Sequence, residues 1–315
     1  MVKRVLLASP RGFCAGVERA VETVEQALDL YGAPIYVRKE IVHNFHVVRE
    51  LEARGAVFVE SEADVPEGAT LVLSAHGVAP SVHAGAAARG LTTIDATCPL
   101  VTKVHAQVRR YAADGFTVIL VGHEGHEEVV GTMGEAPEAV VLVQTVEDAE
   151  ALELPDTDRI AYSTQTTLSV DETGEIVDVL RRRFPQLREP EKSDICYATT
   201  NRQHAVRQML HEVDLLLVIG SRNSSNSNRL VEVGCAAGVE SHLIDDETGI
   251  DEAWLEGCET VGITSGASAP ESLVTRVCDW FRDRGVRDIS PFAAVVEDVV
   301  FKLPVELRRA QSSPA

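Results

Sequence analysis

Val5-Leu6-Leu7-Ala8-Ser9-Pro10-Arg11-Gly12-Phe13-Cys14-Ala15-Gly16-Val17 reads as a strand, a loop and the start of a helix. The run 5–8 is apolar throughout and short, which is typical of a strand buried on both faces. Apolar residues then recur at positions 17, 21, 24 and 28, the spacing of one helix face, until Gly32 ends the pattern. This stretch therefore predicts one strand-loop-helix unit with a cysteine in its loop.

The same unit recurs along the chain. Further apolar runs that lead into polar loops are Thr70–Leu73, Thr117–Val121, Arg159–Tyr162, Leu215–Ile219 and Thr260–Ile263. Continuous apolar strands that alternate with helices predict an α/β fold with parallel sheets covered on both faces. We expect three αβα domains, at residues 1–97, 98–195 and 196–290, whose loops face a shared centre, followed by a C-terminal tail at 291–315.

Composition limits the possible partners. The chain has 315 residues, 45% of them hydrophobic, and a formal net charge of −20. Such an acidic surface repels nucleic acid and anionic membranes, so neither is expected as a partner. The apolar run at the N-terminus is too short for a signal peptide. We expect a cytoplasmic protein.

Three cysteines occupy equivalent loops, one in each third of the chain. Their settings are Arg11–Gly16 around Cys14, Asp95–Pro99 around Cys98 and Asp194–Ala198 around Cys196. Three thiolates leave one coordination position of a metal centre open. Unrelated buried thiols and a zinc ion with three cysteines remain alternatives, but ligands from three separate domains fit a large cubane cluster better. Cys235, Cys258 and Cys278 are interpreted as small buried hydrophobes.

Polar residues at the other strand ends indicate an anion site. His43, His76 and His126 follow apolar runs, and protonated imidazoles bind phosphate through charge-assisted hydrogen bonds. The run Asn223–Asn228 stands between a strand and a helix. One residue of it suffices for an N-cap, so the whole run fits a phosphate cradle better. Gly266–Pro270 offers a similar arrangement.

Glu128 is a candidate proton donor, because it follows a histidine on a strand-end loop and burial would raise its pKa. Neither a P-loop nor the dinucleotide-binding glycine pattern occurs. No C-x-x-C pair occurs either, which argues against thioredoxin chemistry and most structural zinc sites.

With these residues assembled, nearly the whole chain resembles the 4-hydroxy-3-methylbut-2-enyl diphosphate reductase family. The strings that carry the resemblance are Pro10–Val17, Ser74–Val78, Asp95–His105, Thr164–Val170, Ile195–Gln203 and Asn223–Arg229.

The resemblance implies a trefoil of three αβα domains around a [4Fe-4S] cluster, which Cys14, Cys98 and Cys196 would hold with one iron open. The implied activity is the reductive dehydroxylation of a diphosphate substrate to isopentenyl and dimethylallyl diphosphates, fed by an electron-donor protein of ferredoxin or flavodoxin type. The implied acid is Glu128, with His126 and Thr166 beside it, and Thr166 and Thr167 orient the substrate hydroxyl. The implied diphosphate ligands are His43, His76, His126, Ser224, Ser225, Asn226 and Ser268.

Two other functions fit some of the same residues. A zinc-dependent hydrolase would use the three cysteines and His126, and would be colourless. An iron-sulfur redox sensor would be brown but needs a partner-binding or DNA-binding element, and the sequence has no basic helix.

Overall fold

The computed structural model describes residues 2–154 and 158–312. The chain divides into two compact units. Unit 1 comprises Met1–Glu18, His43–Arg49 and Tyr197–Val300; unit 2 comprises Arg19–Val42, Glu50–Cys196 and Phe301–Ala315. Helices α1 (Ala15–Tyr31) and α2 (Phe45–Ala53) each run from unit 1 into unit 2. None of the helices among the described residues has the length and apolar character that a membrane crossing requires.

Unit 1 is built on a parallel sheet of order β10-β9-β11-β1-β12. Its strands are β1 (Arg4–Ser9), β9 (Leu215–Ile219), β10 (Glu240–Ile244), β11 (Thr260–Ser265) and β12 (Asp288–Ala293). Its further helices are α8 (Tyr197–Met209), α9 (Ser225–Ala236) and α10 (Glu271–Asp283), with 3₁₀ turns η2 (Leu210–Glu212), η3 (Glu247–Gly249) and η4 (Glu252–Leu255).

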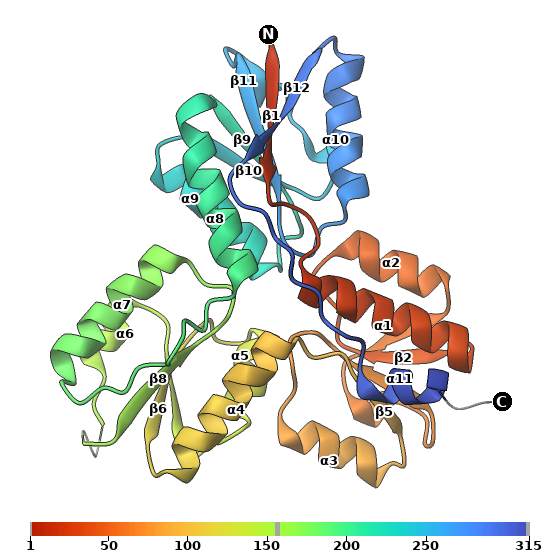
Figure 1. Cartoon of the computed structure of the whole chain (residues 1–315), viewed down its shortest axis with the longest axis vertical. Coiled ribbons are helices and arrows are strands. Elements are labelled where there is room, and N and C mark those ends of the chain that lie inside the picture. Colours follow the sequence, from red (N-terminus) through yellow and green to blue (C-terminus); the bar gives the residue numbers. More distant parts are fainter. Residues whose placement is uncertain (1, 155–157, 313–315) are drawn as a thin grey trace. The chain divides into compact units, whose positions relative to one another are not determined.

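The run of apolar residues in β9 is explained by helices on both faces of this sheet. Leu217 packs in one core with α10, whereas Leu216 packs in another with α8 and α9. Figure 1 shows α10 on one side of the sheet and α8 with α9 on the other. Since successive side chains of a strand point to opposite faces, both sets must be apolar.

Unit 2 contains two further parallel sheets, of order β3-β2-β4-β5 and β7-β6-β8. The strands of the first are β2 (Ile35–Arg38), β3 (Ala56–Val59), β4 (Thr70–Leu73) and β5 (Thr92–Asp95). Those of the second are β6 (Thr117–Val121), β7 (Val140–Val143) and β8 (Ile160–Thr164). Its further helices are α3 (Pro80–Ala88), α4 (Pro99–Ala113), α5 (Glu127–Met133), α6 (Val146–Ala151), α7 (Val170–Arg183) and α11 (Val305–Ser312), with the 3₁₀ turn η1 (Glu62–Asp64).

Strand β6 repeats the arrangement of β9. Ile119 packs in a core with α6 and α7, and Leu120 packs in a core with α4 and α5. The prediction of parallel α/β sheets covered on both faces is therefore confirmed.

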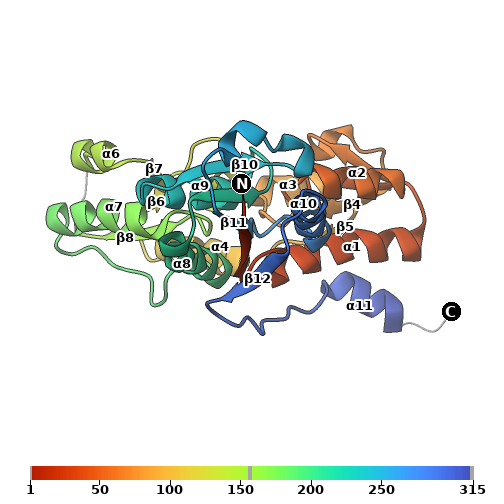
Figure 2. The ribbon, with the colours of Figure 1, turned by 90° about the horizontal axis from the view of Figure 1, so that it is seen from above.

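The membership of the first sheet differs from the domain limits expected from the sequence. A domain of residues 1–97 would keep Arg4–Ser9 with the strands that follow it, yet β1 pairs with β11 and β12. Pro291–Ala293, in the expected tail, belong to β12, after which the chain runs on to α11 (Figure 2). Parallel partners are joined by long connections, so no local pattern identifies them. The expected end of the tail, 313–315, lies outside the described residues.

Gly77, just after His76, is a position where a side chain would be costly. Its φ is +79°, and a Cβ atom there would lie 2.8 Å from Cε1 of His105. Gly68 has a similar φ of +75° with no atom within 4 Å of the corresponding point. A side chain at Gly68 would therefore cause backbone strain alone, whereas one at Gly77 would cause both backbone strain and steric overlap.

We expect Gly68→Ala to lower the free energy of unfolding by about 1–2 kcal/mol, the usual cost of a positive φ. Gly77→Ala should lower it by roughly another 1–3 kcal/mol, because His105 must also move. Urea unfolding of the metal-free protein measures both values. Equal losses in the two variants would show that His105 yields without cost.

Candidate functional site

Each of the three predicted metal-binding cysteines stands directly before a helix. Helix α1 begins after Cys14, α4 after Cys98 and α8 after Cys196, and all three side chains are partly buried. Cys98 is the N-cap of α4 and makes no side-chain capping bond. A helix N-terminus carries a partial positive charge, so these are favourable positions beside an anionic cluster.

The backbone amides of the cysteines donate to neighbouring strand-end loops. The N–H of Cys14 donates to the carbonyl of Ala267 at 3.2 Å, that of Cys98 to Ala75 at 3.0 Å and that of Cys196 to Thr166 at 3.0 Å. Two of the acceptors, Ala267 and Ala75, are sequence neighbours of the predicted substrate ligands Ser268 and His76. The third acceptor, Thr166, is itself a predicted substrate ligand. Each predicted metal ligand is thus bonded to a loop that carries predicted substrate ligands.

The chemistry of the donor set fits an iron-sulfur cluster. Three thiolates are soft ligands, and iron-sulfur clusters are held mainly by cysteine thiolates. Cys14 belongs to unit 1, and Cys98 and Cys196 belong to unit 2. Among the described residues, no three His, Cys, Asp or Glu side chains are grouped to hold a single metal ion.

The other three cysteines differ from these. Cys258 and Cys278 are buried, as expected, and burial raises the pKa of each thiol. The prediction that Cys235 is buried is wrong, because it is exposed near the end of α9. The core under α9 is instead filled by Leu230 and Val233.

The predicted acid, Glu128, is 2% exposed and held by one residue. Its Oε1 accepts from the N–H of Thr166 at 2.6 Å and its Oε2 accepts from the Thr166 hydroxyl at 3.0 Å. Burial raises the pKa of Glu128 to about 7; the bonds from Thr166 oppose this rise, and the charge of Asp194 adds to it. A carboxyl group with this pKa can both hold and release a proton near neutrality.

The neighbouring carboxylate, Glu127, has a different environment. It lies 3.5 Å from the Lys39 ammonium and 3.9 Å from the Arg38 guanidinium. Glu127 is therefore paired with cations of the β2 end, whereas Glu128 points into the buried site. The geometry favours Glu128 as the acid.

His76 and His126 meet in unit 2. Their ring centroids are 5.9 Å apart, with the ring planes at 90°. Nδ1 of His126 accepts from the N–H of Glu128 at 3.2 Å and caps α5. An acceptor at Nδ1 places the proton of the neutral ring on Nε2, which leaves that nitrogen as a donor. The hydroxyl of Thr167, also in unit 2, accepts from the side-chain amide of Gln165 at 2.8 Å.

The remaining predicted substrate ligands lie in unit 1. The Ser268 hydroxyl donates to the carbonyl of His43 at 2.9 Å, which joins two of them. Asn226 is 5% exposed; its Oδ1 accepts from Ala267 at 2.9 Å and its Nδ2 donates to Thr199 at 3.1 Å. His43, Ser224, Ser225, Asn226 and Ser268 are thus collected in one unit.

Ser224 also does what a capping residue does. It is the N-cap of α9, and its hydroxyl oxygen accepts from the N–H and the hydroxyl of Ser227 at 3.4 and 3.0 Å. Capping by Ser224 leaves Ser225 and Asn226 in the first turn of α9, where backbone N–H groups favour an anion.

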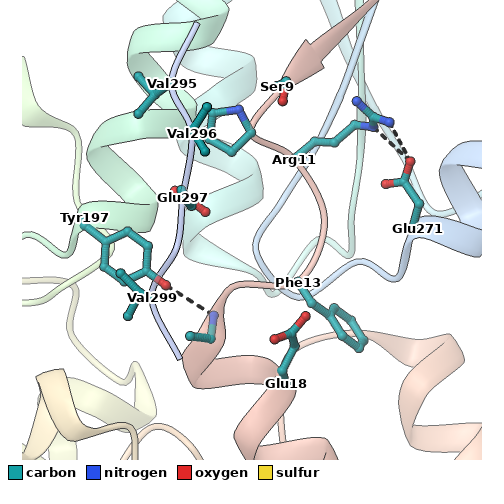
Figure 3. Close-up of a pocket in the computed structure, with 12 residues that line it drawn as sticks. Ser9, Arg11, Phe13, Glu18, Tyr197, Glu271, Val295, Val296, Glu297 and Val299 are labelled. Carbon is teal, nitrogen blue, oxygen red and sulfur yellow. Dashed lines mark hydrogen bonds and ion pairs between the residues drawn. The ribbon is translucent and has the colours of Figure 1, made fainter. Parts of the chain in front are cut away.

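A pocket of about 420 Å³ opens in unit 1 beside the Cys14 loop (Figure 3). Residues that line it include Arg11, Phe13, Glu18, Tyr197, Glu271, Val296 and Glu297. An ion pair of 2.6 Å joins Arg11 to Glu271, and the Tyr197 hydroxyl accepts from the N–H of Ala15 at 3.2 Å. No predicted substrate ligand lines this pocket, so it is distinct from the candidate substrate site.

Sequence reasoning did not single out Tyr197, Thr199 or Arg202. All three lie in the string Ile195–Gln203, directly after Cys196, and bond to other parts of unit 1. Their proximity to the cysteine was the available signal, but their partners are far away in the sequence.

Comparisons with known proteins agree on one family. A family model described as LytB protein matches residues 5–282. The chain is 61% identical over 308 residues to a 4-hydroxy-3-methylbut-2-enyl diphosphate reductase of Acidothermus cellulolyticus, covering 98% of this chain and 91% of that protein. It is 60% identical over 307 residues to the protein of that name from Nocardia farcinica, covering 97% and 91%.

A solved structure is also similar over the whole chain. It is the E-1-hydroxy-2-methyl-but-2-enyl-4-diphosphate reductase of Plasmodium falciparum, with a TM-score of 0.95, 39% identity and 98% of each chain covered.

The buried acid should make stability depend on pH. The pKa of Glu128 rises from 4.5 to about 7 on folding, so between these values the folded protein binds more protons than the unfolded chain. The stability it contributes is present below the lower value and is lost as the pH rises through the upper one, by up to about 3 kcal/mol.

Glu128→Gln should therefore gain stability relative to the parent protein between about pH 4 and pH 8. Thermal unfolding of the metal-free proteins across this range measures the difference. Glu127→Gln is the matched control, since it leaves Glu128 in place and should keep the parent's pH dependence. A difference between Glu128→Gln and the parent that does not change with pH would contradict a raised pKa.

Proposed function

Because the chain belongs to the LytB protein family, we propose that it is a 4-hydroxy-3-methylbut-2-enyl diphosphate reductase. It reduces (E)-4-hydroxy-3-methylbut-2-enyl diphosphate to isopentenyl and dimethylallyl diphosphates, the last step of the non-mevalonate isoprenoid pathway. The reaction consumes two electrons and two protons and releases the hydroxyl group as water. The observation that carries the proposal is the buried acid Glu128, bonded to Thr166, whose carbonyl accepts from the amide of Cys196.

Cys14, Cys98 and Cys196 would hold a [4Fe-4S] cluster with one iron free of protein ligands. When bound, the cluster supplies electrons one at a time and a Lewis-acidic iron with an open position. Each of the three cysteines stands directly before the first turn of a helix.

Glu128 delivers the proton that the departing hydroxyl needs. At neutral pH a carboxyl group with a pKa of about 7 is protonated in a large share of molecules. Thr166 holds the carboxyl group through both of its oxygens, so the proton is presented in one direction. Since the Thr166 hydroxyl donates to Glu128, its oxygen can accept from the substrate hydroxyl, with Thr167 and His126 beside it.

The diphosphate is bound by imidazoles, hydroxyls and an amide. The proposed ligands are His43, His76, His126, Ser224, Ser225, Asn226 and Ser268. In a chain with a net charge of −20, such local donors replace a basic surface. The electrons come from a ferredoxin- or flavodoxin-type protein, and the proposed location is the cytoplasm, where thiols stay reduced.

Replacing Cys14, Cys98 or Cys196 by serine should abolish cluster binding, because each thiolate would anchor a separate iron. Iron and sulfide analysis after anaerobic purification measures this, together with the visible spectrum. Cys235→Ser is the control, since Cys235 is exposed and outside the three loops. Full iron and sulfide in a Cys98→Ser protein would refute the proposed ligand set.

Glu128→Gln should lower turnover by roughly 10²–10⁴-fold, the usual contribution of general acid catalysis, while substrate still perturbs the spectrum of the bound cluster. Glu127→Gln should be nearly silent, because its carboxylate faces Lys39 and Arg38. Steady-state assays with a chemical reductant measure both. Activity lost in Glu127→Gln and kept in Glu128→Gln would reassign the acid.

A further inference from the structure

A cation follows each of the three cysteines at nearly the same distance along the helix. Arg19 and Lys103 stand five residues after Cys14 and Cys98, and Arg202 stands six after Cys196. None of the three is the proposed acid or one of the proposed diphosphate ligands. Each one instead donates to backbone carbonyls in a loop that precedes another of the three cysteines.

Arg19, on α1, holds the loop before Cys98. Its Nη1 donates to the carbonyl of Thr97 at 3.0 Å and its Nη2 to that of Asp95 at 3.3 Å. Its Nε donates to the carbonyl of Lys302 at 2.8 Å. Burial lowers the pKa of Arg19, and the negative charges of Asp95 and Cys98 oppose that change, so the cation lies within electrostatic reach of the thiolate.

Lys103, on α4, holds the loop before Cys196. Its Nζ donates to the carbonyls of Lys192 and Ser193 at 3.2 and 3.3 Å, and it lies 3.3 Å from Oδ1 of Asp194. The side chain of Asp194 is fully buried. One turn further along α4, Gln107 donates to Oδ2 of the same carboxylate at 3.0 Å. Two residues of α4 therefore fix this loop.

Arg202, on α8, holds the loop before Cys14. It is fully buried, and its Nη2 donates to the carbonyl of Gly12 at 2.7 Å. Its Nη1 contacts both oxygens of Glu297 at 3.2 and 3.3 Å. The N–H of Gly12 donates to the Ser265 hydroxyl at 2.8 Å, so Gly12 is held through both its N–H and its carbonyl.

The three contacts follow a cyclic order along the chain. The helix after Cys14 holds the loop before Cys98, the helix after Cys98 holds the loop before Cys196, and the helix after Cys196 holds the loop before Cys14. Surface cations of an acidic chain usually pair with exposed carboxylates, which contribute little to stability. In each of the three loops the carbonyl acceptors lie within four residues before the cysteine, which indicates a shared task.

We propose that Arg19, Lys103 and Arg202 are positioning residues that fix the three cysteine loops for cluster binding. This inference rests on the proposed function. A loop held by charge-assisted hydrogen bonds presents its thiolate in one place and loses less entropy when the ligand binds. The cations also offset the negative charge that three thiolates and a reduced cluster bring together.

The test compares Arg19→Met, Lys103→Met and Arg202→Met, which remove the charge and keep an unbranched apolar side chain. Arg110→Met on α4 and Arg207→Met on α8 are the matched controls, and Lys103→Arg is the conservative variant. Cluster loss to an iron chelator is followed in anaerobically reconstituted protein. Losing a charge-assisted hydrogen bond to a loop carbonyl should increase the rate of cluster loss by about tenfold.

The effect should follow burial, largest for Arg202→Met and smallest for Lys103→Met, and the midpoint potential should become more negative in each. The controls and Lys103→Arg should behave as the parent. Parental chelation rates in all three Met variants would overturn the inference. A second outcome would also overturn it. This is faster cluster loss that only parallels a lower melting temperature of the metal-free variants and that is also seen in Lys103→Arg.

A second measurement needs no cluster. Alkylation of the metal-free protein by iodoacetamide at about pH 10, where most thiols are ionised, reports access to each cysteine. Arg19→Met should speed the modification of Cys98, Lys103→Met that of Cys196 and Arg202→Met that of Cys14, each by about threefold or more. Unchanged rates, or equal changes at all three cysteines, would overturn the inference. A parent protein that binds no iron while this pattern holds would refute only the proposed function.

Discussion

Every strand pair in the three sheets is parallel, and this constraint determines where the predicted site residues lie. In a parallel sheet the carboxyl ends of neighbouring strands lie at one edge, so the loops that leave them become neighbours. The loop after β1 carries Cys14 and the loop after its partner β11 carries Ser268. The loops after β4 and β5 carry His76 and Cys98 in the same way. The hydrogen bonds from the backbone N–H groups of Cys14 and Cys98 to the carbonyls of Ala267 and Ala75 follow from this proximity.

The buried carboxyl group shows how one environment produces a usable acid. Removing Glu128 from water disfavours its charged form, and the two hydrogen bonds from Thr166 favour it. Desolvation is the larger effect, so the pKa rises but stops near neutrality. Without Thr166 the same carboxyl group would hold its proton more tightly and release it less readily. In the proposed role of Glu128 as the acid, these hydrogen bonds would affect both the orientation of the carboxyl group and its pKa.

The acidic composition shapes the site as well. The chain has 29 lysines and arginines and 49 acidic residues, so few cationic side chains are available to bind an anionic ligand. The proposed diphosphate ligands are accordingly histidines, hydroxyls and an amide. Arg19, Lys103 and Arg202, on the helices that follow the cysteines, each donate to a backbone carbonyl of a cysteine loop. Such charge-assisted hydrogen bonds restrict the conformation of the loop.

The sequence by itself determined the strands that are buried on both faces, the helices after the cysteine loops, and the residue types at the strand ends. Burial and helical period are local properties, and runs such as Leu215–Ile219 record them directly. Only the tertiary structure decided that β1 pairs with β12, that Glu128 rather than Glu127 is buried, and that Cys235 is exposed. It also decided that Arg202 reaches Gly12. Strand partners, burial and hydrogen-bond acceptors depend on segments far apart in the chain, and desolvation depends on all of them together.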